Sequence, residues 1–260
     1  MAPQDKLFGV GLGVDFPVAL VDGLLARFQG QKPEDLARAH VIVNTERMGR
    51  RIKQILTQKG ALLHPKIILL SDLFDLTGPL PFAAPQSPLI NRFELISLVS
   101  KLLDQQKDFA ARASLFDLSD SLASLIDEIQ GEGVDPETIA QLNVSDQSGH
   151  WQRTQSFLRI VQSYLESRDT NPDKESFQRQ KIAFLADKWV KNPISEPVFL
   201  AGSTGSRGAA LLLIQAIAQL DKGGIILPGM DWDKKQHLHS TTARHAMQED
   251  HPQYRFIKVA

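Results

Sequence analysis

The stretch Val198-Phe-Leu-Ala-Gly202-Ser-Thr-Gly205-Ser-Arg-Gly208-Ala-Ala-Leu-Leu-Leu213 decides the fold of this chain. An apolar strand runs through a glycine-rich loop directly into an apolar helix, which is the order in which α/β proteins build a phosphate-cradling turn. The glycines are spaced Gly-x-x-Gly-x-x-Gly and lack the Gly-Lys-Ser/Thr of an ATP-hydrolysing loop, so we expect no ATPase activity.

This loop has two interpretations. As an anion site, it would hold a phosphate with the N–H groups at the helix start, the hydroxyls and the arginine. As a structural turn, it would need glycine only because the backbone bends tightly and the helix packs close to the sheet. The candidate anion-binding residues are Gly202, Ser203, Thr204, Gly205, Ser206 and Arg207.

Apolar runs on both sides of the loop predict an α/β fold. Strands are expected at residues 7–12, 39–45, 65–70, 198–201 and 224–228, with helices between them at 16–28, 46–59 and 209–220. This alternation predicts a parallel sheet covered on both faces. Helical periodicity instead fills 89–103, 114–130, 136–142, 151–168 and 176–189. The predicted layout is a first part of the α/β core at 1–84, an all-helical insertion at 85–192, a second part of the core at 193–230 and a polar tail at 231–260.

Composition excludes several classes of function. The 260-residue chain has no cysteine, which rules out disulfides, thiol nucleophiles, thiolate zinc sites and iron–sulfur clusters within it. Its formal net charge of −1 gives no overall attraction to nucleic acid, so any such contact requires a local patch. We found no apolar run of about 20 residues and no secretory signal, and we expect a cytoplasmic protein without a membrane partner or a cofactor.

A basic helix follows the second expected strand. Thr45 stands at the carboxyl end of that strand, where α/β proteins place ligands, and four cations follow it within two turns. Such cations can contact a DNA backbone, although a solvated amphipathic face explains them as well. The candidate DNA-binding residues are Thr45, Arg47, Arg50, Arg51 and Lys53.

Other polar clusters are weak signals. Asp231 and Asp233 follow the last expected strand, and His237, His239, His245 and His251 lie in the tail, but their spacing matches no closed metal site. No G-x-S-x-G elbow or ordered Ser-His-Asp set is present. We therefore assign no metal ligand and no catalytic residue.

Several strings resemble the AddB family in its alphaproteobacterial form, in the N-terminal part of that subunit. They are His150-Trp-Gln-Arg-Thr-Gln-Ser-Phe-Leu-Arg-Ile-Val161, Ala201-Gly-Ser-Thr-Gly-Ser206, Gly224-Ile-Ile-Leu-Pro-Gly-Met-Asp231 and His251-Pro-Gln-Tyr254. The resemblance runs in order through nearly the whole chain. AddB is the non-motor partner of the AddAB helicase–nuclease, which processes double-strand DNA breaks for recombination.

The resemblance implies a helicase-like parallel sheet core that contacts DNA and an AddA-like motor subunit. It places Thr45 and the arginines after it where such folds meet a DNA strand. AddB proteins are longer and end in a nuclease domain that this sequence lacks, so we expect a truncated, non-catalytic module without helicase or nuclease activity of its own. The alternative is a stand-alone nucleotide- or phosphate-binding protein that uses the loop at Gly202 to Gly208.

Overall fold

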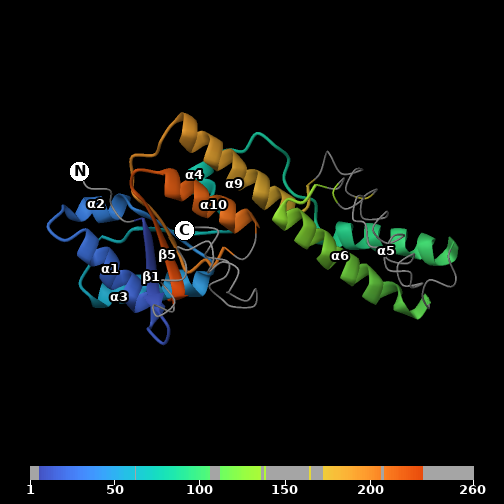
Figure 1. The fold of residues 1–260 in the computed structure, drawn as a ribbon, viewed down its shortest axis with the longest axis horizontal. Helices are drawn as coiled ribbons and strands as arrows, with labels where there is room; N and C mark the ends of the chain where they lie inside the picture. Colours follow the sequence, from blue (N-terminus) through green and yellow to red (C-terminus); the bar gives the residue numbers. More distant parts are fainter. Residues whose placement is uncertain are drawn as a thin grey trace, which may run out of the picture. The chain divides into compact units, whose positions relative to one another are not determined.

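The computed structural model describes residues 6–61, 63–105, 112–135, 138, 164, 172–205 and 208–230 (Figure 1). The chain divides into two compact units, one formed by Met1–Pro79 with Lys181–Ala260 and the other by Leu80–Gln180. The sequence placed these boundaries at residues 84/85 and 192/193. The division instead passes through helix α9 (Lys174–Lys191), which contributes its residues from Lys181 onward to the first unit.

The first unit contains a five-stranded, all-parallel sheet, which confirms the α/β class. Its strands follow the order β1-β5-β4-β2-β3, so the sequence neighbours β1 and β2 lie apart. The register places Val43 opposite Ala201 at the centre of the sheet. The strands are β1 (Leu7–Gly11), β2 (His40–Val43), β3 (Lys66–Leu69), β4 (Val198–Ala201) and β5 (Gly223–Met230).

Helices cover both faces of this sheet (Figure 1). On the first face, α1 (Phe16–Arg27) and α3 (Glu46–Gln58) pack against Val41, Val43 and Phe199. On the second face, α9 and α10 (Gly208–Gln219) pack against Ile42 and Leu200. Because successive side chains of a strand point to opposite faces, the apolar runs of β2 and β4 supply both cores.

Two short helices were not predicted from the sequence. They are α2 (Pro33–Arg38) and α4 (Phe74–Thr77). Each is too short to show the repeat of apolar residues on which the sequence prediction relied. Lys188 Nζ donates hydrogen bonds to the carbonyl oxygens of Leu76 and Thr77, at 3.0 and 3.1 Å, and so satisfies the end of α4.

The second unit is helical in the part that the structure describes. It contains α5 (Pro88–Gln105), a 3-10 turn at Arg112–Ser114 and α6 (Leu115–Glu132). Leucine, valine and isoleucine side chains of α5 and α6 form its core, and Arg92 makes a two-pronged pair with Asp120 at 2.8 Å. Except for residues 138 and 164, the helices predicted at 136–142 and 151–168, and the tail at 231–260, lie outside the described residues.

The centre of the sheet is a topological switch point. The chain leaves β2 for α3 on the first face, whereas it leaves the adjacent strand β4 for α10 on the second face. Open α/β sheets bind ligands beside the carboxyl ends of two such strands. Both predicted candidate sites begin there, one after β2 and one after β4.

Candidate functional site

A hydrogen bond joins the two strand ends at the switch point. The side-chain amide of Asn44, directly after β2, donates from Nδ2 to the carbonyl oxygen of Gly202, directly after β4, at 2.9 Å. The N–H of Gly202 donates in turn to the carbonyl oxygen of Ile226 in β5, at 3.0 Å. The loop start is thereby tied to both neighbouring strands.

Glycine is required at position 202 for two reasons. Its φ of +79° lies in the left-handed region, which costs a residue with a Cβ about 1–2 kcal/mol. A Cβ there would also approach Phe16 Cε1 to 3.3 Å. The backbone bonds and this packing account for Gly202 without a ligand.

One further hydrogen bond holds the described part of the glycine loop after Gly202. Ser203 is 4% exposed, and its Oγ accepts a hydrogen bond from the N–H of Gly205 at 3.4 Å. Gly205 has a φ of +62°. Thr204 is partly exposed, and Ser206 and Arg207 lie outside the described residues. These bonds favour the structural interpretation of the loop, and anion binding stays a prediction.

Helix α3 begins at the same edge with a side-chain cap. Thr45 has extended backbone angles, and its Oγ1 accepts a hydrogen bond from the N–H of Met48 at 3.2 Å. This bond fixes where the helix begins. The hydroxyl proton of Thr45 remains a donor. The peptide N–H groups of the first helical turn add partial positive charge at this end of α3.

The four predicted cations of α3 are all exposed. Arg50 lies 3.5 Å from Glu46 and Arg51 lies 3.8 Å from Asp15, and exposed pairs of this kind contribute at most about 1 kcal/mol. Within the described part of the chain, Arg47 and Lys53 have no carboxylate at ion-pair distance. Arg47, Arg50 and Arg51 share the outer face of the helix, because residues three and four apart lie together. We call these three residues the α3 arginine surface.

Sequence reasoning missed two residues at this edge. Asn44 and Asp15 each follow a strand, and the only available signal was a polar residue at that position. Asp15 caps α1 by accepting from the N–H of Val18 at 3.2 Å and also faces Arg51. Asp15 positions the start of α1, and Asn44 joins the ends of β2 and β4.

A buried lysine lies beside the end of β3. Lys181 is 7% exposed, and its Nζ donates to the carbonyl oxygen of Ser71 at 2.8 Å. Burial lowers the pKa of Lys181, whereas the nearby carboxylate of Asp72 acts in the opposite direction. The bond to Ser71 ties α9 to the segment that precedes the helical unit in sequence, which is a structural role.

The described residues contain no group of three or more histidine, aspartate or glutamate side chains that could hold a metal ion. In that same part of the chain, every helix is too short or too polar to cross a membrane. No protein-family model matches this sequence, and no curated protein is significantly similar to it.

Proposed function

We propose that this chain is a non-catalytic DNA-contacting module and that the α3 arginine surface holds the phosphates of a DNA strand. One observation carries the proposal: three exposed arginines lie on one face of a helix whose N-terminus opens at the switch point. Glu46 in the first turn of α3 supplies the acidic side chain that helix starts favour and lies 3.5 Å from Arg50, whereas Arg47 in the same turn adds positive charge to the positive end of the helix dipole. A bound phosphate would relieve that repulsion.

The chemistry of the site supports contact without catalysis. Arginine binds phosphate through paired N–H donors, and such contacts fix the position of a strand without reading its sequence. The glycine loop lacks the lysine of an ATP-hydrolysing site. In the break-repair role that the AddB-like strings imply, the module would act in the cytoplasm, and an AddA-like motor subunit would supply the energy.

The test is fluorescence anisotropy with labelled single-stranded and duplex-end DNA over a series of salt concentrations. We expect the affinity to fall as salt rises, since each phosphate contact contributes about 0.9 to the logarithmic salt slope on duplex and about 0.7 on single strands. Replacing Arg47, Arg50 and Arg51 by alanine together should reduce that slope by about 2–3.

A charge-matched variant provides the control. Arg38, Lys191 and Lys222 are exposed cations that precede strands β2, β4 and β5, away from the carboxyl edge. Their joint replacement by alanine removes the same charge and should leave the salt slope unchanged. Equal losses in the two triple variants, or no salt-sensitive binding by the parent chain, would contradict the proposed surface.

A further inference from the structure

The two edge strands of the parallel sheet differ in the residues that keep an edge from pairing. Strand β3 follows Pro65 and begins at the exposed Lys66. Proline and exposed lysine are means by which proteins prevent an edge strand from pairing with another chain. Strand β1 has no proline and no charged side chain from Leu7 to Val14. In the part of the chain that the structure describes, no strand pairs with its outer side. The edge of β1 is therefore open to a further strand.

Half of the backbone groups of β1 face away from β5. The ladder to β5 begins at the carbonyl oxygen of Lys6, which accepts a hydrogen bond of 2.7 Å. Along a strand, residues that bond one neighbour alternate with residues that face the other side. Leu7, Gly9 and Gly11 therefore present their N–H and C=O groups outward. The carbonyl oxygen of Gly11 also accepts from the N–H of Val14, at 3.4 Å. This row of donors and acceptors can form a second ladder.

We propose that the edge of β1 binds the β1 strand of a second copy of this chain, antiparallel, with Gly9 at the two-fold axis. This register pairs every outward-facing residue, because Leu7 lies opposite Gly11 of the second copy and Gly9 lies opposite Gly9. The side chains are complementary in size, since leucine always meets glycine. No like charges oppose each other, because the strand has no charged side chain. The sequence of β1 is therefore complementary to its own reverse.

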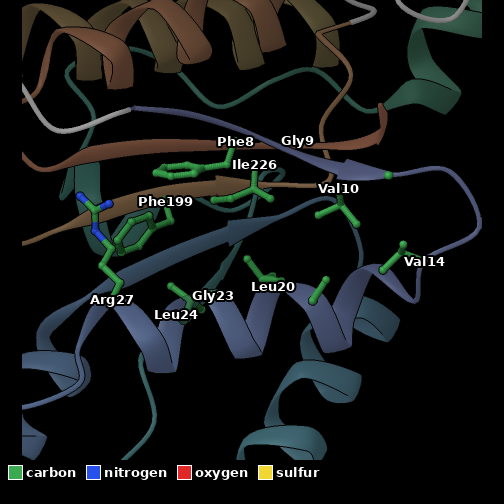
Figure 2. Close-up of a pocket in the computed structure, with 12 residues that line it drawn as sticks. Phe8, Gly9, Val10, Val14, Leu20, Gly23, Leu24, Arg27, Phe199 and Ile226 are labelled. Atoms are coloured by element: carbon green, nitrogen blue, oxygen red, sulfur yellow. The ribbon is translucent and has the colours of Figure 1, made fainter. Parts of the chain in front are cut away.

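An apolar cavity of about 380 Å³ between α1 and β1 supports the same contact (Figure 2). Phe8 and Val10 of β1 line it, and so does Val14, which is 54% exposed, so the cavity opens at the surface. In the proposed register Phe8 lies opposite Val10 of the second copy on this same face of the sheet. Such aromatic–β-branched pairs stabilise antiparallel strands. The second copy would thus cover apolar surface that is open in the single chain, away from the α3 arginine surface.

Cysteine crosslinking tests both the contact and its register, because the chain has no cysteine of its own. Opposed residues in a hydrogen-bonded antiparallel pair have Cα atoms about 5.5 Å apart, which is within the range of a disulfide. Under mild oxidation, Gly9→Cys should crosslink into dimers. Leu7→Cys and Gly11→Cys should not crosslink separately, since four residues along a strand separate equal positions by about 13 Å. Mixed together, these two variants should crosslink.

The matched control for crosslinking is Lys66→Cys, an exposed position on the opposite edge strand, which should stay uncrosslinked. Three crosslinking results would overturn the proposal. They are no crosslink from Gly9→Cys together with none from the mixture, crosslinking of Leu7→Cys alone as readily as the mixture, and crosslinking of Lys66→Cys as readily as Gly9→Cys.

Analytical ultracentrifugation of the unmodified full chain provides a measurement that needs no variant. We expect a concentration-dependent mass of two chains with a Kd of about micromolar, since a contact between five-residue strands is small. Leu7→Lys gives β1 the lysine that β3 already has and should raise the Kd by roughly tenfold or more. Val190→Lys, at an exposed position of α9, should leave it unchanged. The mass of one chain at every concentration, or a dimer that Leu7→Lys does not weaken, would overturn the proposal.

Discussion

The β2–α3 and β4–α10 units lie side by side at the centre of the sheet, and they end their strands in different ways. Val43 and Ala201 are register partners, so the two strands stop at the same level. After β2, a threonine cap opens a helix with exposed arginines. After β4, a glycine turn opens the helix Gly-Ala-Ala-Leu-Leu-Leu-Ile-Gln-Ala-Ile-Ala-Gln, which has no ionisable side chain.

A conspicuous glycine motif after a strand can be explained by backbone geometry alone. The glycine loop is the stronger sequence signal, but its described N–H groups at Gly202 and Gly205 donate to Ile226 and Ser203. The plainer threonine-arginine stretch presents its donors to solvent. Four substitutions test how the two strand ends are held. Their expected effects on the free energy of unfolding decrease in the order Gly202, Thr45, Asn44 and His40.

Gly202→Ala should have the largest effect. The left-handed φ costs alanine about 1–2 kcal/mol, and its Cβ would lie 3.3 Å from Phe16 Cε1, so the phenyl ring must also shift. Gly60→Ala is the matched control, since Gly60 has a φ of +80° with nothing within 4 Å of a Cβ. Gly60→Ala should therefore lower the free energy of unfolding only by the cost of the left-handed φ. Urea unfolding measures both, and equal losses would show that packing at Gly202 is unimportant.

Thr45→Ala should cost about 1 kcal/mol, within the range of about 0.5–2 kcal/mol for a lost N-cap. The reason is the loss of the acceptor for the Met48 N–H. Thr45→Ser keeps an equivalent oxygen and should remain close to the parent stability. Thermal and urea unfolding of the two variants provide the comparison. A serine variant as unstable as the alanine variant would argue against the cap.

Asn44→Ala should cost about 0.5–1.5 kcal/mol, because it removes the hydrogen bond that joins the end of β2 to the end of β4. The exposure of Asn44 places the expected loss toward the lower end of this range. Gln58→Ala, at an exposed position of α3, should stay within about 0.5 kcal/mol of the parent. Urea unfolding again measures the difference. Identical stability of the two variants would mean that the Asn44 bond does not couple the strand ends.

His40 opens β2 at the opposite edge and provides the smallest predicted effect, a dependence on pH. Burial, followed by the positive charge of Lys66, lowers the pKa of His40 below its ordinary value of 6.5, against the opposing carboxylates of Glu196 and Asp75. As pH falls below 6.5, the unfolded chain therefore takes up this proton before the folded chain does. The contribution of His40 to the free energy of unfolding is fully present above pH 6.5. It decreases as the pH falls toward the pKa of His40 in the folded state.

The measurement for His40 is urea unfolding of the parent chain and of His40→Gln, from about pH 7.5 to about pH 5.5, the range in which histidine titrates. The difference between the two free energies should decrease as pH falls. Subtraction removes the contribution of the other histidines. A difference that is constant over the whole range would contradict a lowered pKa.

Much of the fold follows from local sequence pattern. The apolar runs at Val41–Val43 and Val198–Ala201 predicted strands that the structure contains, and alternation with helices predicted the parallel sheet. The local sequence pattern did not predict the order of the strands in the sheet. That order depends on contacts between distant parts of the chain, such as the pairing of β1 with β5. The helicase-like character of the core stays a prediction.

The candidate site was predictable only in part. Thr45 and the arginines are visible as a basic helix after a strand, whereas the role of Asn44 depends on a partner 158 residues away. The apolar cavity between α1 and β1 leaves no pattern in the sequence, because it forms only where the helix lies against the sheet. The local sequence predicts which residues are exposed, whereas the tertiary fold decides which of them lie in contact.

The most direct test of the central claim is site-specific photocrosslinking to DNA. A photoreactive amino acid is placed at Gln54 on α3 or at Gln215 on α10, two exposed glutamines on the two compared helices. We expect a salt-sensitive DNA crosslink from position 54, which lies beside Arg51, and none from position 215. A crosslink from position 215 with none from position 54 would contradict it.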